Sequence, residues 1–218
     1  MLIESTLTQA FRAESWQTLL TDLFPNELLD LLPTPESIAS TQDFISEVQQ
    51  LGRITLGEDT ILLLTVETGD SVYLPRNCVG LRSFLTPFLD DPDFDAVLAV
   101  FHQPESPNWR ITYASRSYTF DQDGQLKKEE TAPKRFTFLA GKNEPPRTTA
   151  EGLKSIQLKG EELTLSDVEK AFSVQRVSKN FFDDYLAHYE AFVDELLSDE
   201  RATETRSLSS TFPPRQMK

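Results

Sequence analysis

The spacing of apolar residues predicts that the first quarter of the chain is helical. Apolar side chains recur at three- and four-residue steps over residues 5–32, and Pro25 ends or kinks this helix. The segment PTPES at 33–37 predicts a break, and residues 41–51 predict a second, shorter helix.

After residue 51 the apolar period shortens to two, which predicts strands. Residues 52–74 are expected to form two or three strands with turns at 57–59 and 69–70. The unbroken apolar run at 61–64 predicts a central strand covered on both faces. The pattern also predicts a helix at 77–89, strands at 95–103, 108–120 and 134–140, and a polar hairpin at 121–130.

The chain is predicted to be helical again from Thr148 onward. Thr148 with Glu151, and Ser166 with Glu169, have the spacing of a capping box. In that motif a hydroxyl and a carboxylate bind backbone N–H groups that are free at the start of a helix. Two helix starts are therefore expected here.

A long amphipathic helix is predicted at 174–197, followed by a disordered tail. Its aromatic stripe is larger than most soluble monomers leave open. We expect the helix to fold back on the sheet domain, anchored at Phe172 and Val174, or to mediate association. The stripe consists of Val177, Phe181, Tyr185, Tyr189, Phe192 and Leu196.

Together these elements predict an α/β (α+β) fold with a mixed central sheet, flanking helices and a long C-terminal helix. The expected organisation has four parts: an N-terminal helical segment (1–40), a mixed-sheet domain (41–160), a helical arm (161–198) and a disordered tail (199–218).

Length and composition narrow the class of protein. A chain of 218 residues can form one medium domain with an appendage, or two small domains. A single cysteine, Cys78, excludes an internal disulfide and a cysteine-rich zinc site. No signal peptide and no membrane-spanning run is expected, so we predict a soluble cytoplasmic protein without a membrane partner.

The formal net charge of −14 argues against a free-standing DNA-binding protein. Basic residues are nevertheless concentrated at 127–147, where Lys134, Arg135, Lys142 and Arg147 are candidate DNA-binding residues. A helix start preceded by basic residues can bind phosphate. The same stretch also has the features of an ordinary strand-to-helix connection, and the sequence leaves both alternatives open.

Acidic residues beside a strand suggest a metal site. Nucleases of the PD-(D/E)XK type bind Mg²⁺ through an Asp and through an acid two residues before a lysine on the following strand. The candidate metal ligands are Glu58, Asp59 and Glu67, and Asp59 and Glu67 are also the candidate catalytic residues. The acid-x-Lys unit is missing, so ordinary surface acids at strand ends are the alternative.

Other reaction chemistry has little support in the sequence. Cys78, His102 and His188 lie far apart, which disfavours a Cys–His hydrolase and a zinc centre.

Four stretches, in this order, resemble the N-terminal region of the large type IIG restriction-modification enzymes. In these enzymes an endonuclease-like domain is fused to an adenine-specific DNA methyltransferase. The resemblance covers about residues 40–197 and implies a restriction-endonuclease-like sheet and a role in defence. The stretches are VYLPRNCVGLRSFL, DAVLAVFHQPESPNWRITYAS, ETAPKRFTFLAGKNEPPRTTAEGL and LSDVEKAFSVQRVSKNFFDDYLAHYEAFV.

By position, the resemblance implies metal-binding acids near Asp59 and Thr65 and a lysine at Glu67. Two of these three positions do not match, which puts Mg²⁺-dependent cleavage in doubt. The chain also has no NPPY-type segment and no Gly-rich loop for S-adenosylmethionine, so we expect a detached or truncated N-terminal module without methyltransferase activity.

Three functions remain open. The leading hypothesis is a nuclease-like module with little or no activity of its own and weak DNA binding. The first alternative is a non-enzymatic module that docks through 174–197 on a methyltransferase subunit or associates with itself. The second is an active Mg²⁺-dependent endonuclease that uses Glu58, Asp59 and Glu67.

Overall fold

The computed structural model divides the chain into two units, residues 1–173 and 174–218. The first is described at residues 2–40, 42–74, 79–116, 118–120, 126–128, 133–142 and 144–173, and the second at scattered positions between 185 and 195.

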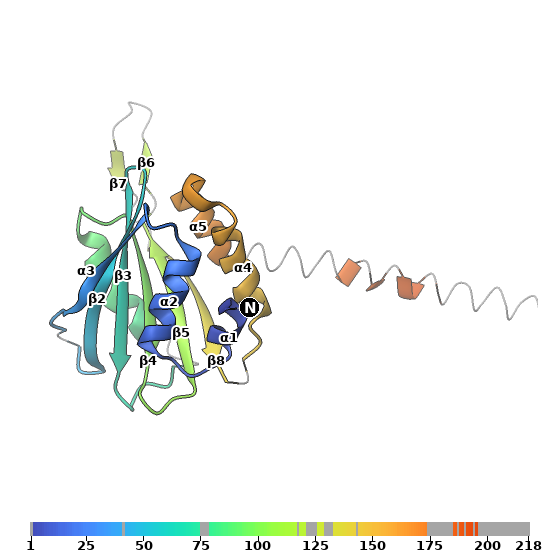
Figure 1. Ribbon diagram of the computed structural model, residues 1–218, viewed down its shortest axis with the longest axis horizontal. Coiled ribbons are helices and arrows are strands. Elements are labelled where there is room, and N and C mark those ends of the chain that lie inside the picture. Colours follow the sequence, from blue (N-terminus) through green and yellow to red (C-terminus); the bar gives the residue numbers. More distant parts are fainter. Residues whose placement is uncertain are drawn as a thin grey trace, which may run out of the picture. The chain divides into compact units, whose positions relative to one another are not determined.

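The centre of the first unit is a mixed six-stranded sheet in the order β1-β2-β3-β4-β5-β8 (Figure 1). β3 and β4 are parallel, and all other neighbouring strands of this sheet are antiparallel. β6 and β7 form a separate two-stranded ribbon. The strands are β1 (Leu29–Ser37), β2 (Ile45–Leu56), β3 (Asp59–Thr68), β4 (Ala96–His102), β5 (Asn108–Ser115), β6 (Tyr118–Phe120), β7 (Leu126–Lys128) and β8 (Lys134–Gly141).

Helices cover both faces of the sheet. A parallel strand pair needs a crossover connection, which places a helix on one of these faces. That crossover is α3, and α1, α2, α4 and α5 pack on the opposite face (Figure 1). The helices are α1 (Leu2–Leu7), α2 (Ala13–Leu23), α3 (Val79–Asp90), α4 (Arg147–Gln157) and α5 (Leu165–Phe172), with a short 3₁₀ turn, η1, at Gly160–Glu162.

The predicted central strand is confirmed as β3. Ile61 and Leu63 are buried under the four-helix face, whereas Leu62 and Leu64 are buried under α3. A strand buried on both faces has no polar alternation, and this explains the unbroken apolar run. The predicted mixed sheet with flanking helices is thereby confirmed.

The predicted N-terminal helices are wrong in part. The helix expected over residues 5–32 is two helices followed by strand β1, and β2 begins at Ile45, within the second predicted helix. Ile45, Val48 and Leu51 are buried at three-residue steps because irregularities on both sides of 47–50 shift the strand register. The bulges thus produce a helix-like spacing in a strand.

Two prolines explain why strand β1 was not predicted from the sequence. Pro33 and Pro35 lie between Leu31 and Glu36, where the pairing of β1 with β2 is interrupted. β1 is an edge strand of the sheet, and edge strands tolerate proline.

The pairing of β2 with β1 also requires a glycine at position 52. Gly52 has φ 149°, and a Cβ there would lie 2.1 Å from the carbonyl oxygen of Asp30.

Both predicted capping boxes are wrong. Helix α4 begins at Arg147, and Glu151 accepts a hydrogen bond from the Arg147 Nε at 2.9 Å instead of capping the helix. The box of α5 lies two residues earlier than expected. Thr164 Oγ1 accepts from the Asp167 backbone N–H, and Asp167 Oδ2 accepts from the Thr164 backbone N–H.

The compact unit is larger than the predicted sheet domain. Residues 1–40 supply β1 as well as helices, and α5 of the predicted arm belongs to this unit. Phe172 is buried there and stacks on Tyr113 and Phe138, with ring centroids 5.6 and 5.5 Å away. Boundaries at 40 and 160 therefore do not divide the structure.

The second unit is described at few positions. Tyr185, Tyr189 and Phe192 are helical there, with 57%, 54% and 58% of their surface exposed. Most of the predicted helix, including Val174, lies outside the described residues, as do the predicted tail and Cys78. Folding back of this helix stays a prediction.

The position of the α5 capping box can be tested with two substitutions. Thr164→Ala removes the hydroxyl that binds the Asp167 N–H and should lower the free energy of unfolding by about 1 kcal/mol in urea denaturation. Ser166→Ala is the matched control and should have a much smaller effect. A larger loss for Ser166→Ala would contradict the observed cap.

Candidate functional site

A pocket of about 280 Å³ lies where the parallel strands β3 and β4 end. In sheets with parallel strands, ligands commonly bind beyond the carboxyl ends of those strands. Polar side chains from three neighbouring strands meet there. The pocket is lined by Phe11, Ala13, Glu47, Gln49, Thr65, Glu67, His102, Gln103 and Pro104.

Strand register places the titratable residues of this pocket in one row. Glu67 of β3 pairs with Glu47 of the antiparallel strand β2 and with His102 of the parallel strand β4. Two residues further into the sheet, Gln49 of β2 pairs with Thr65 of β3. Residues paired across a sheet share a face, so these side chains lie on the face covered by α1 and α2.

The connection between α1 and α2 forms the wall of the pocket. The ring of Phe11 stacks on His102, with centroids 4.3 Å apart, and is tilted against Trp109 at 5.6 Å. Trp109 Nε1 donates a hydrogen bond to the carbonyl oxygen of Gln9 at 2.9 Å. Burial lowers the pKa of His102 to about 4, although the nearby Glu47 carboxylate acts in the opposite direction. The imidazole is therefore neutral at pH 7.

Hydrogen bonds fix the chain that leaves β3 beside this pocket. Gln103 Nε2 donates to the carbonyl oxygens of Gly69 and Val72 at 2.7 and 2.8 Å. The buried Arg110 donates from Nε to the carbonyl oxygen of Leu74. These bonds hold the segment after β3 against the end of β4.

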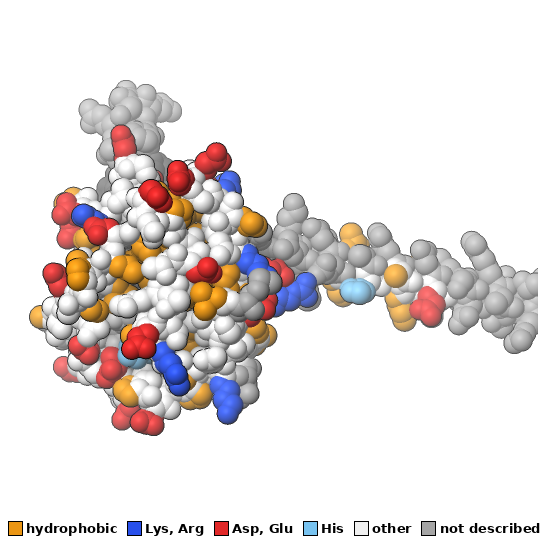
Figure 2. Space-filling view, viewed as in Figure 1, with side chains coloured by type: hydrophobic (Ala, Val, Ile, Leu, Met, Phe, Trp, Pro, Cys, Tyr) orange, Lys and Arg blue, Asp and Glu red, His pale blue; other side chains and the backbone are white. Residues whose placement is uncertain are grey.

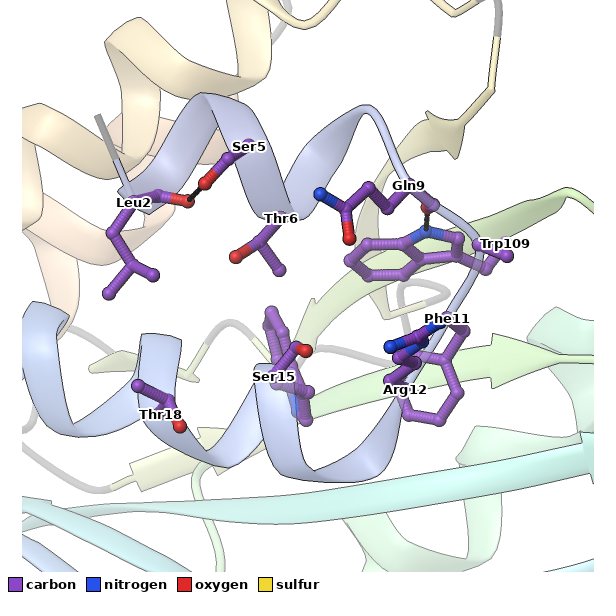
Figure 3. Close-up of a pocket in the computed structure, with 11 residues that line it drawn as sticks. Leu2, Ser5, Thr6, Gln9, Phe11, Arg12, Ser15, Thr18 and Trp109 are labelled. Carbon is purple, nitrogen blue, oxygen red and sulfur yellow. Dashed lines mark hydrogen bonds between the residues drawn. The ribbon is translucent and has the colours of Figure 1, made fainter.

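A second pocket, of about 220 Å³, lies between α1 and α2 (Figure 3). Hydroxyl groups from both helices face it, but Ser5 Oγ donates to the carbonyl oxygen of Leu2 and Thr18 Oγ1 to that of Glu14. Because two of the four hydroxyl side chains that line it, Ser5 and Thr18, bind their own helices, we interpret this pocket as a crevice of helix packing. The pocket beside β3 and β4 is the stronger candidate site.

The predicted metal ligands do not come together. Glu58 and Asp59 lie at the beginning of β3 and Glu67 near its end. Eight residues of extended strand span roughly 26 Å, so one ion cannot bind Asp59 and Glu67. Among the described residues no three His, Cys, Asp or Glu side chains are arranged to hold a metal ion.

Asp59 lies in an acidic environment of its own. Partial burial raises its pKa, and the carboxylates of Asp95 and Glu58 raise it further. Asp95 itself is held in place, because its Oδ2 accepts from the Thr60 backbone N–H at 2.9 Å. Several carboxylates thus lie close together at this end of the sheet, but the described residues do not form a metal site there.

The predicted DNA-binding residues form two groups rather than one patch. Lys134 and Arg135 lie at the start of β8, whereas Lys142 follows its end and Arg147 begins α4. Lys134 Nζ bonds to Glu169 Oε1 at 2.8 Å, and Arg147 bonds to Glu151. Acidic side chains are spread over the face of the molecule shown in Figure 2. Phosphate binding by all four residues at once has no geometric support.

Of the residues that line the pocket, only Thr65 and Glu67 were assigned to a site from the sequence, and Glu47 and Phe11 are among the others, which were missed. Glu47 lies in a segment predicted to be helical, and Phe11 reaches the site only because the α1–α2 connection crosses the end of β4. The signal that was present is the position of Thr65 and Glu67 at the end of a buried strand. His188, in contrast, lies in the other unit.

Comparisons with known proteins give no family assignment: no protein-family model matches the chain, and no curated protein matches it. None of the described helices is long and apolar enough to cross a membrane.

The environment of Asp59 predicts a pH-dependent substitution. Its raised pKa means that folding disfavours the ionised form, so this penalty exists above pH 3.8, the ordinary value, and is absent once the carboxyl is protonated. Asp59→Asn should raise the melting temperature by a few degrees at most at pH 7, and the gain should vanish as the pH falls below 3.8. Glu36→Gln, an exposed position on β1, is the control. A gain that is equal at pH 7 and pH 3 would contradict this explanation.

Proposed function

We propose that the chain is a nuclease-like module of a restriction-modification system whose pocket does not support cleavage. The observation behind this proposal is that Thr65 and Glu67 both line the pocket at the end of β3. These are the positions to which the type IIG resemblance assigns the second acid and the lysine. The mixed sheet with helices on both faces agrees with the fold that the resemblance implies.

In this proposal Glu47 replaces Asp59 as the acid on the neighbouring strand. Glu47 is paired with Glu67 across the sheet and lines the same pocket, whereas Asp59 lies at the far end of β3. The acid of an active site must share an ion with the acid of the second strand. Glu47 lines the same pocket as Thr65, the second-acid position, although its direct cross-strand partner is Glu67.

The chemistry of the pocket argues against cleavage. In an active nuclease the metal neutralises the phosphate and activates water, and the lysine orients or activates that water. Thr65 supplies a hydroxyl where a carboxylate is needed, and Glu67 supplies a negative charge where an ammonium group is needed. A phosphodiester entering this pocket would be repelled by Glu67 and Glu47.

The first test is a nicking assay on supercoiled plasmid. The chain should not nick DNA with Mg²⁺ present, because the pocket lacks the acid-x-Lys unit. Mg²⁺-dependent nicking that disappears in Glu67→Ala would contradict the proposal and favour the active endonuclease.

A second variant tests whether the pocket is nuclease-like at all. Thr65→Glu with Glu67→Lys restores the acid-x-Lys unit and should produce weak Mg²⁺-dependent nicking that Glu47→Gln abolishes. Thr60→Glu with Glu58→Lys makes the same change of charge at the other end of β3 and should remain inactive. If the restored variant folds by circular dichroism but stays inactive, the nuclease-like interpretation fails and a binding module is favoured.

DNA binding by the chain alone should be weak and dependent on salt. Lys142 is exposed, and no described carboxylate lies within ion-pairing distance of it, whereas Lys134 is bound to Glu169. Lys142→Ala should therefore reduce the slope of log affinity against log salt by about 0.9, the value for one phosphate contact. Lys134→Ala should leave the slope unchanged, and the opposite pattern would place the contact at the start of β8.

A docking role is the second candidate. The observation that favours it is the exposure of Tyr185, Tyr189 and Phe192 on the helix of the second unit, since exposed aromatic stripes commonly bind partners. The partner in this candidate is a methyltransferase subunit or a second copy of the chain.

A further inference from the structure

The pocket at the end of β3 contains two carboxylates that oppose each other. Glu47 and Glu67 are direct cross-strand partners on the same face of the sheet, and like charges in this position destabilise a sheet. Glu47 Oε1 accepts a hydrogen bond from Gln49 Nε2 at 2.8 Å. Among the described residues, no Lys or Arg lies within ion-pairing distance of either carboxylate. The described chain thus leaves the two charges without a counter-charge.

His102, the third titratable group of the pocket, does not neutralise the charges of the two carboxylates. Because burial lowers the pKa of His102 to about 4, its imidazole is neutral at pH 7. The other walls are uncharged: the Thr65 hydroxyl, the amides of Gln49 and Gln103, and the ring of Phe11. Phe11 reaches the pocket from the connection between α1 and α2, and its ring also borders the crevice drawn in Figure 3.

The size and the donor set of the pocket indicate which cation fits. A volume of about 280 Å³ is several times the ~30 Å³ that one water occupies in the liquid, so a short organic group fits. The described acids and histidines do not converge on a metal ion. An ammonium group needs only hydrogen-bond acceptors and has three donors. Its alkyl stem would lie against the Phe11 ring, and an ammonium group is also attracted by an aromatic face.

We propose that this pocket binds a primary ammonium group on a short alkyl stem, with the Glu47 and Glu67 carboxylates as its acceptors and Phe11 as its apolar wall. The two sources of this chemistry are a free diamine and the lysine side chain of another protein. The inference does not rest on the proposed function, since it uses only the charges and shape of the pocket.

The test is calorimetric titration of the full chain with three probes at constant ionic strength: 1,4-diaminobutane, Nα-acetyl-lysine amide and tetramethylammonium. The first two should bind and the third should bind much more weakly, because it has no N–H donors. Tighter binding of the diamine would indicate a free polyamine, and tighter binding of the lysine derivative a protein side chain.

Variants decide whether the carboxylates are responsible. Glu67→Gln should weaken binding of the better probe about tenfold or more, since it removes a charge-assisted hydrogen bond, and Phe11→Ala should weaken it less. Glu36→Gln, on the edge strand, should have no effect. Equal binding of tetramethylammonium, unchanged binding by Glu67→Gln, or tighter binding of MgCl₂ than of either amine at the same pocket would overturn the proposal. Plasmid nicking is a separate readout, so failure here leaves the proposed function standing.

Discussion

The parallel pairing of β3 with β4 is the constraint on which the rest of the structure depends. Both strands are buried on both faces, so two layers of helix are needed to cover them. The crossover α3 supplies one layer, and α1, α2, α4 and α5 supply the other. Because the strands are parallel, their carboxyl ends lie side by side, and Glu67 comes next to His102. The pocket is therefore a consequence of the topology.

The two ends of β3 have different chemistry, although both are acidic. At its start, partial burial raises the pKa of Asp59, and the carboxylates of Asp95 and Glu58 raise it further. At its end, the α1–α2 connection crosses the strands, which leaves His102 half-buried under Phe11 and Glu67 on the wall of a pocket. Only the second end combines charge, a cavity and an apolar wall, and for this reason the proposed functions are assigned there.

The central strands could be predicted from the sequence, but the residues that β2 and the α1–α2 connection add to the site could not. The run at 61–64 and the helix α3 follow directly from apolar periodicity. β2 has the spacing of a helix, because its bulges place Ile45, Val48 and Leu51 three residues apart on buried positions. Glu47 and Phe11 join the site through register and tertiary packing, which a local pattern does not contain. Glu67 was a candidate because it is an acid beside a predicted strand, and Thr65 was identified by resemblance.

The account depends most directly on a desolvated His102 beneath Phe11, and NMR titration of this imidazole measures that property. The His102 resonances, assigned by their loss in His102→Gln, should titrate with a pKa of about 4. In Phe11→Ala, where water reaches the ring, the pKa should rise towards 6.5, the value of an unperturbed histidine. A pKa near 6.5 in the unmodified chain would contradict the packing of Phe11 over His102 that forms this wall of the pocket.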